Sequence, residues 1–347
     1  MTGEIMARTI KKPRVDDRPI FNIIFGLAGA QALFAAHEIK LFDALAGKSM
    51  HPDEICQAFH LQPRAAQSLL SICASLGLLR LDSDSRYTLT ETAEDYLTTN
   101  GPAYWGGTLD AMLHNKEVYS LDAFHKALLE NSSQAYKGNA LFKSNEEQIE
   151  LAQTFTRSMH SKSMPMAMAW PAKIDLAQYR TMLDIGGGSG AHCIGAVTFW
   201  PHMDAIVFDR PFVCDVADKF IEHHGLRKRL QTHEGDMWHD SFPDADIHFY
   251  SDIFHDWIPD KCRFLARKSF DSLPRGGKII IHEMLFNKEK TGPFFTAAYN
   301  VSMMLWTEGQ QFSGTELVAM LRDAGFTDTK VLATGFGEWS IVTGKKP

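Results

Sequence analysis

Apolar positions follow helical spacing over the first part of the chain. Within residues 20–100, two short helical patterns meet at "HLQP" (60–63), and the second carries an apolar stripe around Leu69 and Leu70. The stretch "LLRLDSDSRYTLTETAEDYL" (78–97) alternates around the polar turn "DSDS", which predicts a small β-hairpin. Helices followed by a hairpin are typical of a winged helix, which we expect over residues 1–100.

The spacing of apolar positions changes near residue 179. Residues 101–170 still read as helical and are rich in methionine and aromatic residues, which indicates a helical linker. Short β-like runs then alternate with helical patterns, which predicts an α/β domain over residues 171–347 with a doubly wound, mostly parallel, Rossmann-like sheet. Ligands of such sheets bind beyond the carboxyl ends of the strands. The runs are "YRTMLDIG" (179–186), "DAIVFD" (204–209), "ADIHFYSD" (245–252), "GKIIIHEML" (277–285), "KVLATG" (330–335) and "WSIVTG" (339–344).

Composition and charge narrow the class of protein. The 347 residues are 45% hydrophobic and 22% charged, as in soluble globular proteins of two domains. A net charge of −7 argues against nucleic-acid binding, and "DSDS" in the hairpin would repel phosphates. We therefore expect the winged helix to mediate dimerisation and not DNA binding. Five scattered cysteines without CxxC spacing indicate reduced thiols and a cytoplasmic protein.

The N-terminal segment has to be examined as a possible signal peptide or membrane-spanning helix. Its first residues include basic ones, but no apolar run of the kind that marks a secretory signal follows them directly. The apolar stretch Ile20–Ala36 is somewhat short for a membrane span and contains Asn22 and Gln31. We expect it to form a helix that is buried or faces a partner, and its small residues, such as Gly26 and Gly29, would permit close approach of a second copy.

A glycine-rich turn follows the first strand of the expected sheet, in "TMLDIGGGSGAHC" (181–193). It fits the loose dinucleotide pattern as Gly186-x-Gly188-x-x-Ala191, and a tight turn without any ligand is the simplest alternative. Asp184 lies just before these glycines, where a carboxylate is unfavourable beside a pyrophosphate. The turn therefore favours a cationic or amino-bearing ligand.

Three further residues point to an adenosine. Asp209 ends the next strand, 23 residues after Gly186, where it could accept both ribose hydroxyls. Asp236 and Met237 follow Gly235 where a third strand should end. The acid can accept a hydrogen bond from an exocyclic amine, and the thioether can pack on a purine. These residues therefore favour an adenosine whose 5′ substituent is not a phosphate, and S-adenosylmethionine (SAM) is such a molecule.

These motifs together resemble a known family. "LDIGGGSG", "VFDRP", "EGDMW", "FHDW", "GGKIIIHEML" and "MLRDAGF" are similar, in order and spacing, to the SAM-dependent O-methyltransferases of the plant caffeate, hydroxyindole and bacterial antibiotic-tailoring type. The resemblance covers almost the whole chain. It implies a homodimer formed through the N-terminal domain, a small-molecule methyl acceptor, and a linker that contributes to the substrate pocket.

The resemblance also assigns residues. It implies that the glycines of the turn hold the methionine part of SAM, Asp209 the ribose, and Asp236 with Met237 the adenine. The full set of expected cofactor-binding residues is Ser163, Asp184, Gly186, Gly187, Gly188, Asp209, Arg210, Gly235, Asp236, Met237 and Ser251. The expected substrate-lining residues are Phe155, Met159, Asn300, Met303 and Met304.

The chemistry requires a base, because a phenol with a pKa of about 10 is scarcely ionised at neutral pH. His255, in "HDW" after a strand, is the expected base, with a pKa of about 6–7. Glu283, at the end of the next strand, is expected to orient the imidazole and stabilise its cation, and the competing partner, Asp256, ranks second.

Two positions depart from the family pattern. Ser251 stands where relatives usually carry a Lys or Arg that touches the cofactor. Gln311, in "EGQQFS", aligns with a second carboxylate of the plant members, and Glu308 lies three residues earlier. Either the histidine has a single carboxylate support, or substrate binding differs.

Two rival functions remain. One is an α-keto-acid C-methyltransferase assisted by a metal on two histidines; no histidine follows His282, so we expect no metal. The other is a winged-helix regulator that binds SAM without turnover, which the pair His255 and Glu283 disfavours. The lining predicts a flat, apolar acceptor but does not name it.

Overall fold

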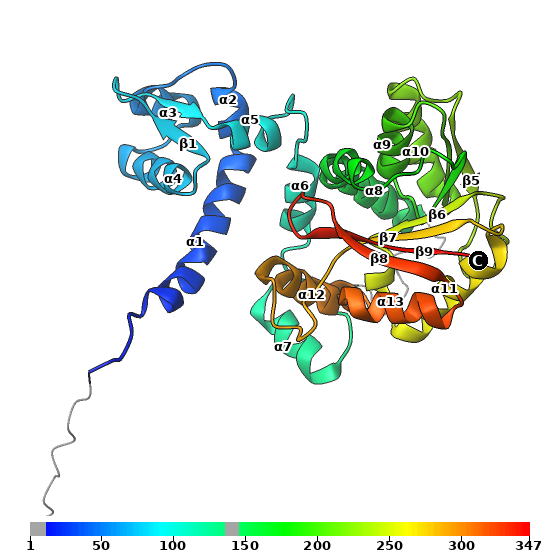
Figure 1. Ribbon diagram of the computed structural model, residues 1–347. Helices are drawn as coiled ribbons and strands as arrows, with labels where there is room; N and C mark the ends of the chain where they lie inside the picture. The colour runs from blue at the N-terminus through cyan, green and yellow to red at the C-terminus, as the bar shows by residue number, and fades with distance from the viewer. Residues whose placement is uncertain (1–11, 136–145) are drawn as a thin grey trace, which may run out of the picture. The chain divides into compact units, whose positions relative to one another are not determined.

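A computed structural model describes residues 12–135 and 146–347 (Figure 1). The chain divides into two compact units, residues 1–102 and 103–347. The first unit is mainly helical, whereas the second is built on a seven-stranded sheet.

The N-terminal unit contains a small antiparallel hairpin and several short helices. Strands β1 and β2 pair with Leu79 opposite Leu89, which confirms the predicted hairpin. Helix α3 begins with a capping box of His51 and Glu54, and a proline occupies the first turn of both α3 and α4. The elements are α1 (Arg18–Glu38), α2 (Leu41–Leu45), α3 (Pro52–Phe59), α4 (Pro63–Ser75), β1 (Leu79–Leu81), β2 (Tyr87–Leu89) and α5 (Glu91–Leu97).

Helix α1 exposes most of its apolar residues within this chain. Its C-terminal half packs on the unit, with Ala36 fully buried and Gly29 close to Leu76 of the loop after α4. Its length and composition would also allow it to cross a membrane, as those of some helices in soluble proteins do. The exposed residues are Ile20, Phe21, Ile23, Ile24, Phe25 and Leu27, each at least 48% accessible.

The sheet of the C-terminal unit has the strand order β5-β4-β3-β6-β7-β9-β8. The pairs from β5 to β7 are parallel, and β9 pairs antiparallel with β7 and β8. This confirms the predicted mostly parallel, doubly wound sheet. The strands are β3 (Thr181–Ile185), β4 (Asp204–Asp209), β5 (Leu230–Glu234), β6 (Ile247–Ser251), β7 (Lys278–Met284), β8 (Thr327–Ala333) and β9 (Trp339–Lys345).

Two apolar clusters cover opposite faces of this sheet because side chains alternate along each strand. Met182 and Phe249 belong to the cluster with α9 and α10, whereas Leu183 and Tyr250 belong to the cluster with α11 and α13. Figure 1 shows these helix pairs on the two sides of the strands. The helices are α6 (Gly106–His114), α7 (Leu121–Glu130), α8 (Glu146–Ala169), η2 (Trp170–Lys173), α9 (Ala191–Phe199), α10 (Pro211–His223), η3 (Phe254–Asp256), α11 (Pro259–Ser272), α12 (Phe294–Trp306) and α13 (Gly314–Asp323).

The strand order places the candidate site. Strand β3 lies between β4 and β6. The chain runs from β3 through β4 to β5 on one side and returns to β6 on the other side of β3. The carboxyl ends of strands at such a switch point form the usual ligand crevice of doubly wound folds. The glycine turn, Asp209 and the His255 loop all follow strands of this group.

Candidate active site

The glycine turn leaves β3 with backbone angles that favour glycine. Gly186, Gly188 and Gly190 have φ values of +70°, +57° and +77°. Gly187 is needed for a different reason, because a Cβ atom there would lie 2.9 Å from the carboxyl carbon of Asp184. Asp184 is 1% exposed, and burial raises its pKa to about 7. The backbone of the glycine turn thus approaches the carboxyl group of Asp184 closely, because Gly187 has no side chain.

Asp209 lies at the end of β4, next to the turn. The N–H of Gly188 donates to its Oδ2 at 2.9 Å, and the N–H of Arg210 donates to its Oδ1 at 2.7 Å. Burial raises the pKa of Asp209 to about 6, although these backbone bonds lower it. The carboxylate is therefore fixed at the strand end, as the ribose assignment requires.

Asp236 follows β5 and already has partners. The Arg210 guanidinium donates to Oδ2 at 2.8 Å, and the N–H of Trp238 donates to Oδ1 at 2.8 Å. Gly235 packs so closely on Phe208 that an added Cβ would lie 2.4 Å from its ring. An adenine amine would therefore share Asp236 with Arg210. Met237 is partly buried against the cluster that faces α11 and α13.

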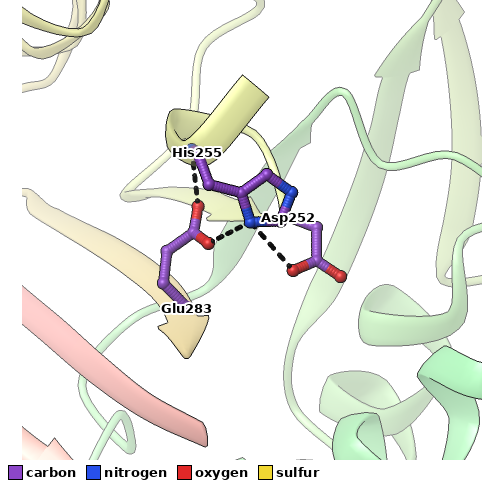
Figure 2. A group of neighbouring side chains, drawn as sticks. All are labelled: Asp252, His255 and Glu283. Carbon is purple, nitrogen blue, oxygen red and sulfur yellow. Dashed lines mark hydrogen bonds and ion pairs between the residues drawn. The ribbon is translucent and has the colours of Figure 1, made fainter. Parts of the chain in front are cut away.

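His255 and Glu283 form a buried pair (Figure 2). His255 lies in η3 after β6, Glu283 lies near the end of β7, and they are 2% and 1% exposed. Nδ1 of the imidazole is 2.7 Å from Oε2 of Glu283, and the backbone N–H of His255 donates to Oε1 at 3.3 Å. Glu283 thus holds both the ring and the backbone of the histidine, as expected of an orienting carboxylate.

Further groups surround the imidazole. Asp256, which the sequence ranks second as a partner of the histidine, lies with its Oδ1 3.5 Å from Nε2. On the other side, Oδ1 of Asp252 lies 3.5 Å from Nδ1, and the side-chain amide of Gln311 lies 3.1 Å from the same atom. Glu308, in contrast, pairs with Lys261 near the surface.

These charges change the titration of His255. Burial lowers its pKa, but the charges of Glu283, Asp252 and Asp256 overcome that effect and raise the pKa to about 9. The expected value of 6–7 was therefore too low, because the sequence did not indicate that three carboxylates meet at this ring. Burial also raises the pKa of Asp256 to about 7, despite the favourable charge of His255.

Lys162 connects α8 to this group. Its Nζ donates to the Tyr299 hydroxyl at 2.6 Å and lies 3.8 Å from Oδ2 of Asp252. The ring of Tyr299 meets that of His255 edge-on at 5.3 Å. Lys162, Asp252 and Tyr299 were all missed in the sequence; the one available signal was the position of Asp252 between a strand and "HDW".

The expected substrate residues lie on two helices, α8 and α12, which the Lys162–Tyr299 bond joins beside His255. Phe155 is 37% exposed and Met303 is buried. Oδ1 of Asn300 accepts from the N–H of Gln311 at 2.8 Å, so Asn300 positions the loop that carries Gln311. Met159 and Met304 are partly buried.

Ser163 and Ser251 have different surroundings. Ser163 is a partly buried residue of α8, next to Lys162. Oγ of Ser251 lies 2.9 Å from Nδ1 of His282, which itself stacks on Trp339. Where relatives usually carry a long basic side chain, this chain therefore has a short one that contacts a neighbouring strand.

Asp252, His255 and Glu283 also offer ligand atoms to a metal. One atom from each lies within 4.8 Å of the others. However, the imidazole nitrogen that faces both carboxylates is the one paired with Glu283 at 2.7 Å. This distance suits a hydrogen bond between the two side chains.

Comparisons with protein families and known proteins give matches over most of the chain. Residues 121–327 match the model of the O-methyltransferase domain, and residues 21–99 match that of the O-methyltransferase dimerisation domain. The 3-hydroxy-5-methyl-1-naphthoate 3-O-methyltransferase of Streptomyces sahachiroi is 31% identical over 320 residues, which is 90% of each chain. The acetylserotonin O-methyltransferase of Bos taurus is 30% identical over 337 residues, covering 92% of this chain and 95% of the relative.

A solved structure extends the similarity to three dimensions. Human N-acetylserotonin methyltransferase in complex with SAM has a TM-score of 0.85 and 26% identity, covering 97% of this chain and 99% of that one. The family models, the relatives and the fold agree with one another. The chain belongs to the family of SAM-dependent O-methyltransferases.

Proposed function

We propose that the protein methylates a hydroxyl group of a small aromatic acceptor, with SAM as methyl donor and His255 as general base. The observation that carries this proposal is the buried His255–Glu283 pair, 2.7 Å apart, on loops and strands that follow the switch point of the sheet. SAM supplies a methyl group on a sulfonium, which is electrophilic without further activation. The protein has to bind the donor, align the acceptor and remove its proton.

The chain's own residues fit SAM. The left-handed turn at Gly186 and Gly188 brings the backbone close to Asp209, and Asp209 offers a fixed carboxylate for two vicinal hydroxyls. Asp184, buried below the turn, would be stabilised in its ionised form by a cationic ligand, which would offset the burial that raises its pKa to about 7. Ser163 on α8 and Met237 after β5 complete the proposed contacts. A pyrophosphate would place its negative charges near the carboxyl groups of Asp184 and Asp209, and it has no positive charge to compensate them.

Glu283 determines which nitrogen of His255 acts. A hydrogen bond from Nδ1–H to Glu283 leaves Nε2 unprotonated, so Nε2 takes the hydroxyl proton. Asp256, 3.5 Å from Nε2, stabilises the imidazolium that forms. A base with a pKa of about 9 is well matched to a phenol of pKa about 10, because proton transfer is then nearly balanced in energy.

The acceptor class follows from the lining and from the relatives. Phe155, Met159, Met303 and Met304, on α8 and α12, are the flat and flexible apolar side chains proposed to line the acceptor site. The named relatives methylate a hydroxynaphthoate and acetylserotonin, both fused bicyclic aromatics. We therefore propose a fused aromatic alcohol as acceptor, and a metal-free reaction.

A screen of methyl acceptors tests the proposal. Chelator-treated protein is incubated with SAM and a panel of phenols, naphthols, hydroxyindoles and α-keto acids, and products are identified by mass spectrometry. We expect O-methylated aromatic products at rates unchanged by added metal. Methylation at the carbon of an α-keto acid, or an absolute metal requirement, would refute the proposed O-methylation. SAM binding without any product would favour the alternative function, a winged-helix regulator.

Three assignments of organisation belong to the same proposal. We propose that residues 1–100 form a winged-helix-like homodimerisation domain, that residues 101–170 contribute to the substrate pocket, and that residues 171–347 bind SAM. The match of residues 21–99 to the dimerisation model and the exposed apolar residues of α1 support the first assignment. We further propose a cytoplasmic enzyme that binds neither nucleic acid nor membranes.

A further inference from the structure

Gln311 raises the question of which group supports the base in place of a second carboxylate. Its uncharged amide, 1% exposed, lies 3.1 Å from Nδ1 of His255. Oδ1 of Asp252 lies 3.5 Å from that same nitrogen, approaching from the loop before η3. We propose that Asp252, held by Lys162, is the second carboxylate of the base and a positioning residue for the reaction. This inference rests on the proposed role of His255.

The backbone of Asp252 indicates a selected conformation. Its φ is +57°, in the left-handed region that costs most residues free energy but that Asp and Asn tolerate. The N–H of Asp252 bonds to the carbonyl of His282 at 3.3 Å, which ties this turn to β7. Strained positions that persist next to reacting groups commonly place a side chain where regular structure could not. Here the turn directs a carboxylate at His255 (Figure 2).

The two oxygens of Asp252 face opposite neighbours. Oδ1 faces His255, whereas Oδ2 lies 3.8 Å from Nζ of Lys162. The side chains of this ion pair, Lys162 and Asp252, are only 13% and 14% exposed. Lys162 is anchored by its hydrogen bond to Tyr299. Lys162 therefore holds the side chain of Asp252 in place, and its own positive charge partly offsets the charge of Asp252 at the imidazole.

Asp252 acts on His255 through charge. Glu283 is the nearer partner of Nδ1, at 2.7 Å, whereas 3.5 Å is too long for a strong hydrogen bond to Asp252. A second negative charge at this distance still favours the imidazolium formed when Nε2 takes the acceptor's proton. Among the described residues, the charged and titratable groups that face the ring are Glu283, Asp252, Asp256, Lys162 and Tyr299.

Two substitutions of opposite sign test the inference. Asp252→Asn keeps the shape and the left-handed backbone but removes the charge, so the pKa of His255 should fall by about one pH unit. Lys162→Gln removes the opposing charge while retaining a donor for Tyr299, so the pKa should rise. The imidazole titration is followed by NMR in the full-length protein with 13C-labelled histidine. In the double variant the two changes should largely cancel.

Activity gives a second, independent measurement. In Asp252→Asn, the pH at which the rate reaches its plateau should move down by about one unit, and the plateau rate should fall about tenfold because the cation is less stabilised. Adding Gln311→Glu to this variant returns a carboxylate near Nδ1 and should restore both. Asp260→Asn is the matched control: this carboxylate, 81% exposed, pairs with Arg263 on α11, and its loss should change neither quantity.

The outcomes separate the two proposals. If Asp252→Asn leaves the titration of His255 unchanged while His255→Ala abolishes turnover, the role of Asp252 is wrong and the base assignment stands. If His255→Ala remains active, the base assignment fails, while the NMR titration still measures the effect of Asp252. Should Asp252→Asn not fold, Asp252→Gly replaces it, because glycine tolerates the φ of +57°; the pKa of His255 must then fall, and no fall would overturn the inference.

Discussion

His255 combines a position among three carboxylates with almost complete burial, and both properties matter for catalysis. Removal of the imidazole eliminates the base without touching the residues proposed to hold SAM. We expect His255→Ala to lower turnover by roughly 10²–10⁴-fold while the affinity for SAM, measured by calorimetry, stays close to that of wild type. Glu283→Gln should cost less, because the imidazole remains but its cation loses support.

The control for this prediction is His125→Ala, an exposed histidine of α7. Acceptors of low phenolic pKa should regain the most rate in His255→Ala, since they need a base least. Turnover within threefold of wild type would contradict a general base at this position.

The raised pKa values of His255 and Asp209 predict how donor binding varies with pH. Protonated His255 repels a cationic sulfonium, so SAM affinity should increase by about tenfold between pH 7.5 and 10, as the imidazole with its pKa of about 9 loses its proton. S-adenosylhomocysteine carries no sulfonium and should lack this increase. Both ligands should weaken below about pH 6, where Asp209 gains a proton and loses acceptor capacity.

Calorimetric titrations of both ligands over this range measure the difference directly, and comparing the two ligands cancels the ionisation of their shared amino group. In His255→Ala the alkaline increase should disappear. An identical pH dependence for the two ligands would show that His255 does not sense the charge of the donor.

At the scale of elements, the turn between β3 and α9 depends on the absence of one side chain. A Cβ at Gly187 would meet the Asp184 carboxyl at 2.9 Å, so Gly187→Ala has to displace either the turn or a buried side chain. We expect SAM affinity to fall at least about tenfold and the free energy of unfolding to fall by about 1–3 kcal/mol, measured by calorimetry and by urea denaturation. Gly26→Ala, on helix α1 with no atom near the added methyl, is the control and should leave SAM affinity unchanged.

The elements themselves were largely predictable, because apolar periodicity changes from helical to alternating where the sheet begins. The carboxyl ends of β3, β4 and β5 brought Gly186, Asp209 and Asp236 to one edge, as expected. What the sequence lacked was information on contacts between distant segments. The amide of Gln311 meets His255 across 56 positions, and the Lys162–Tyr299 bond spans 137. Only tertiary packing creates such contacts, and it also brings Glu283 within 2.7 Å of His255, whose pKa it raises.

At the scale of the whole molecule, we expect the apolar surface of α1 to mediate dimerisation. Ile24 and Leu27 are 60% and 65% exposed in the single chain, which is unfavourable for large aliphatic side chains in water. We expect twice the chain mass of 39.0 kDa in light scattering at micromolar concentration, and a shift toward the monomer in Ile24→Glu/Leu27→Glu.

Leu129→Glu is the matched control for this prediction, because Leu129 is 88% exposed on α7 of the other unit. It should leave the mass unchanged. A wild-type monomer at this concentration, or a dimer that survives both glutamates on α1, would exclude this helix as the dimer contact.

The distribution of cysteines offers a practical way to observe assembly. Four of the five thiols are buried, and burial raises the pKa of Cys73 to about 11 and that of Cys214 to about 12, so they are poor nucleophiles near neutral pH. Cys56 on α3 is the partly accessible one. The natural chain therefore accepts a single spin label without engineering. A dimer would carry two such labels and give one dipolar distance between the N-terminal units, and a monomer would give none.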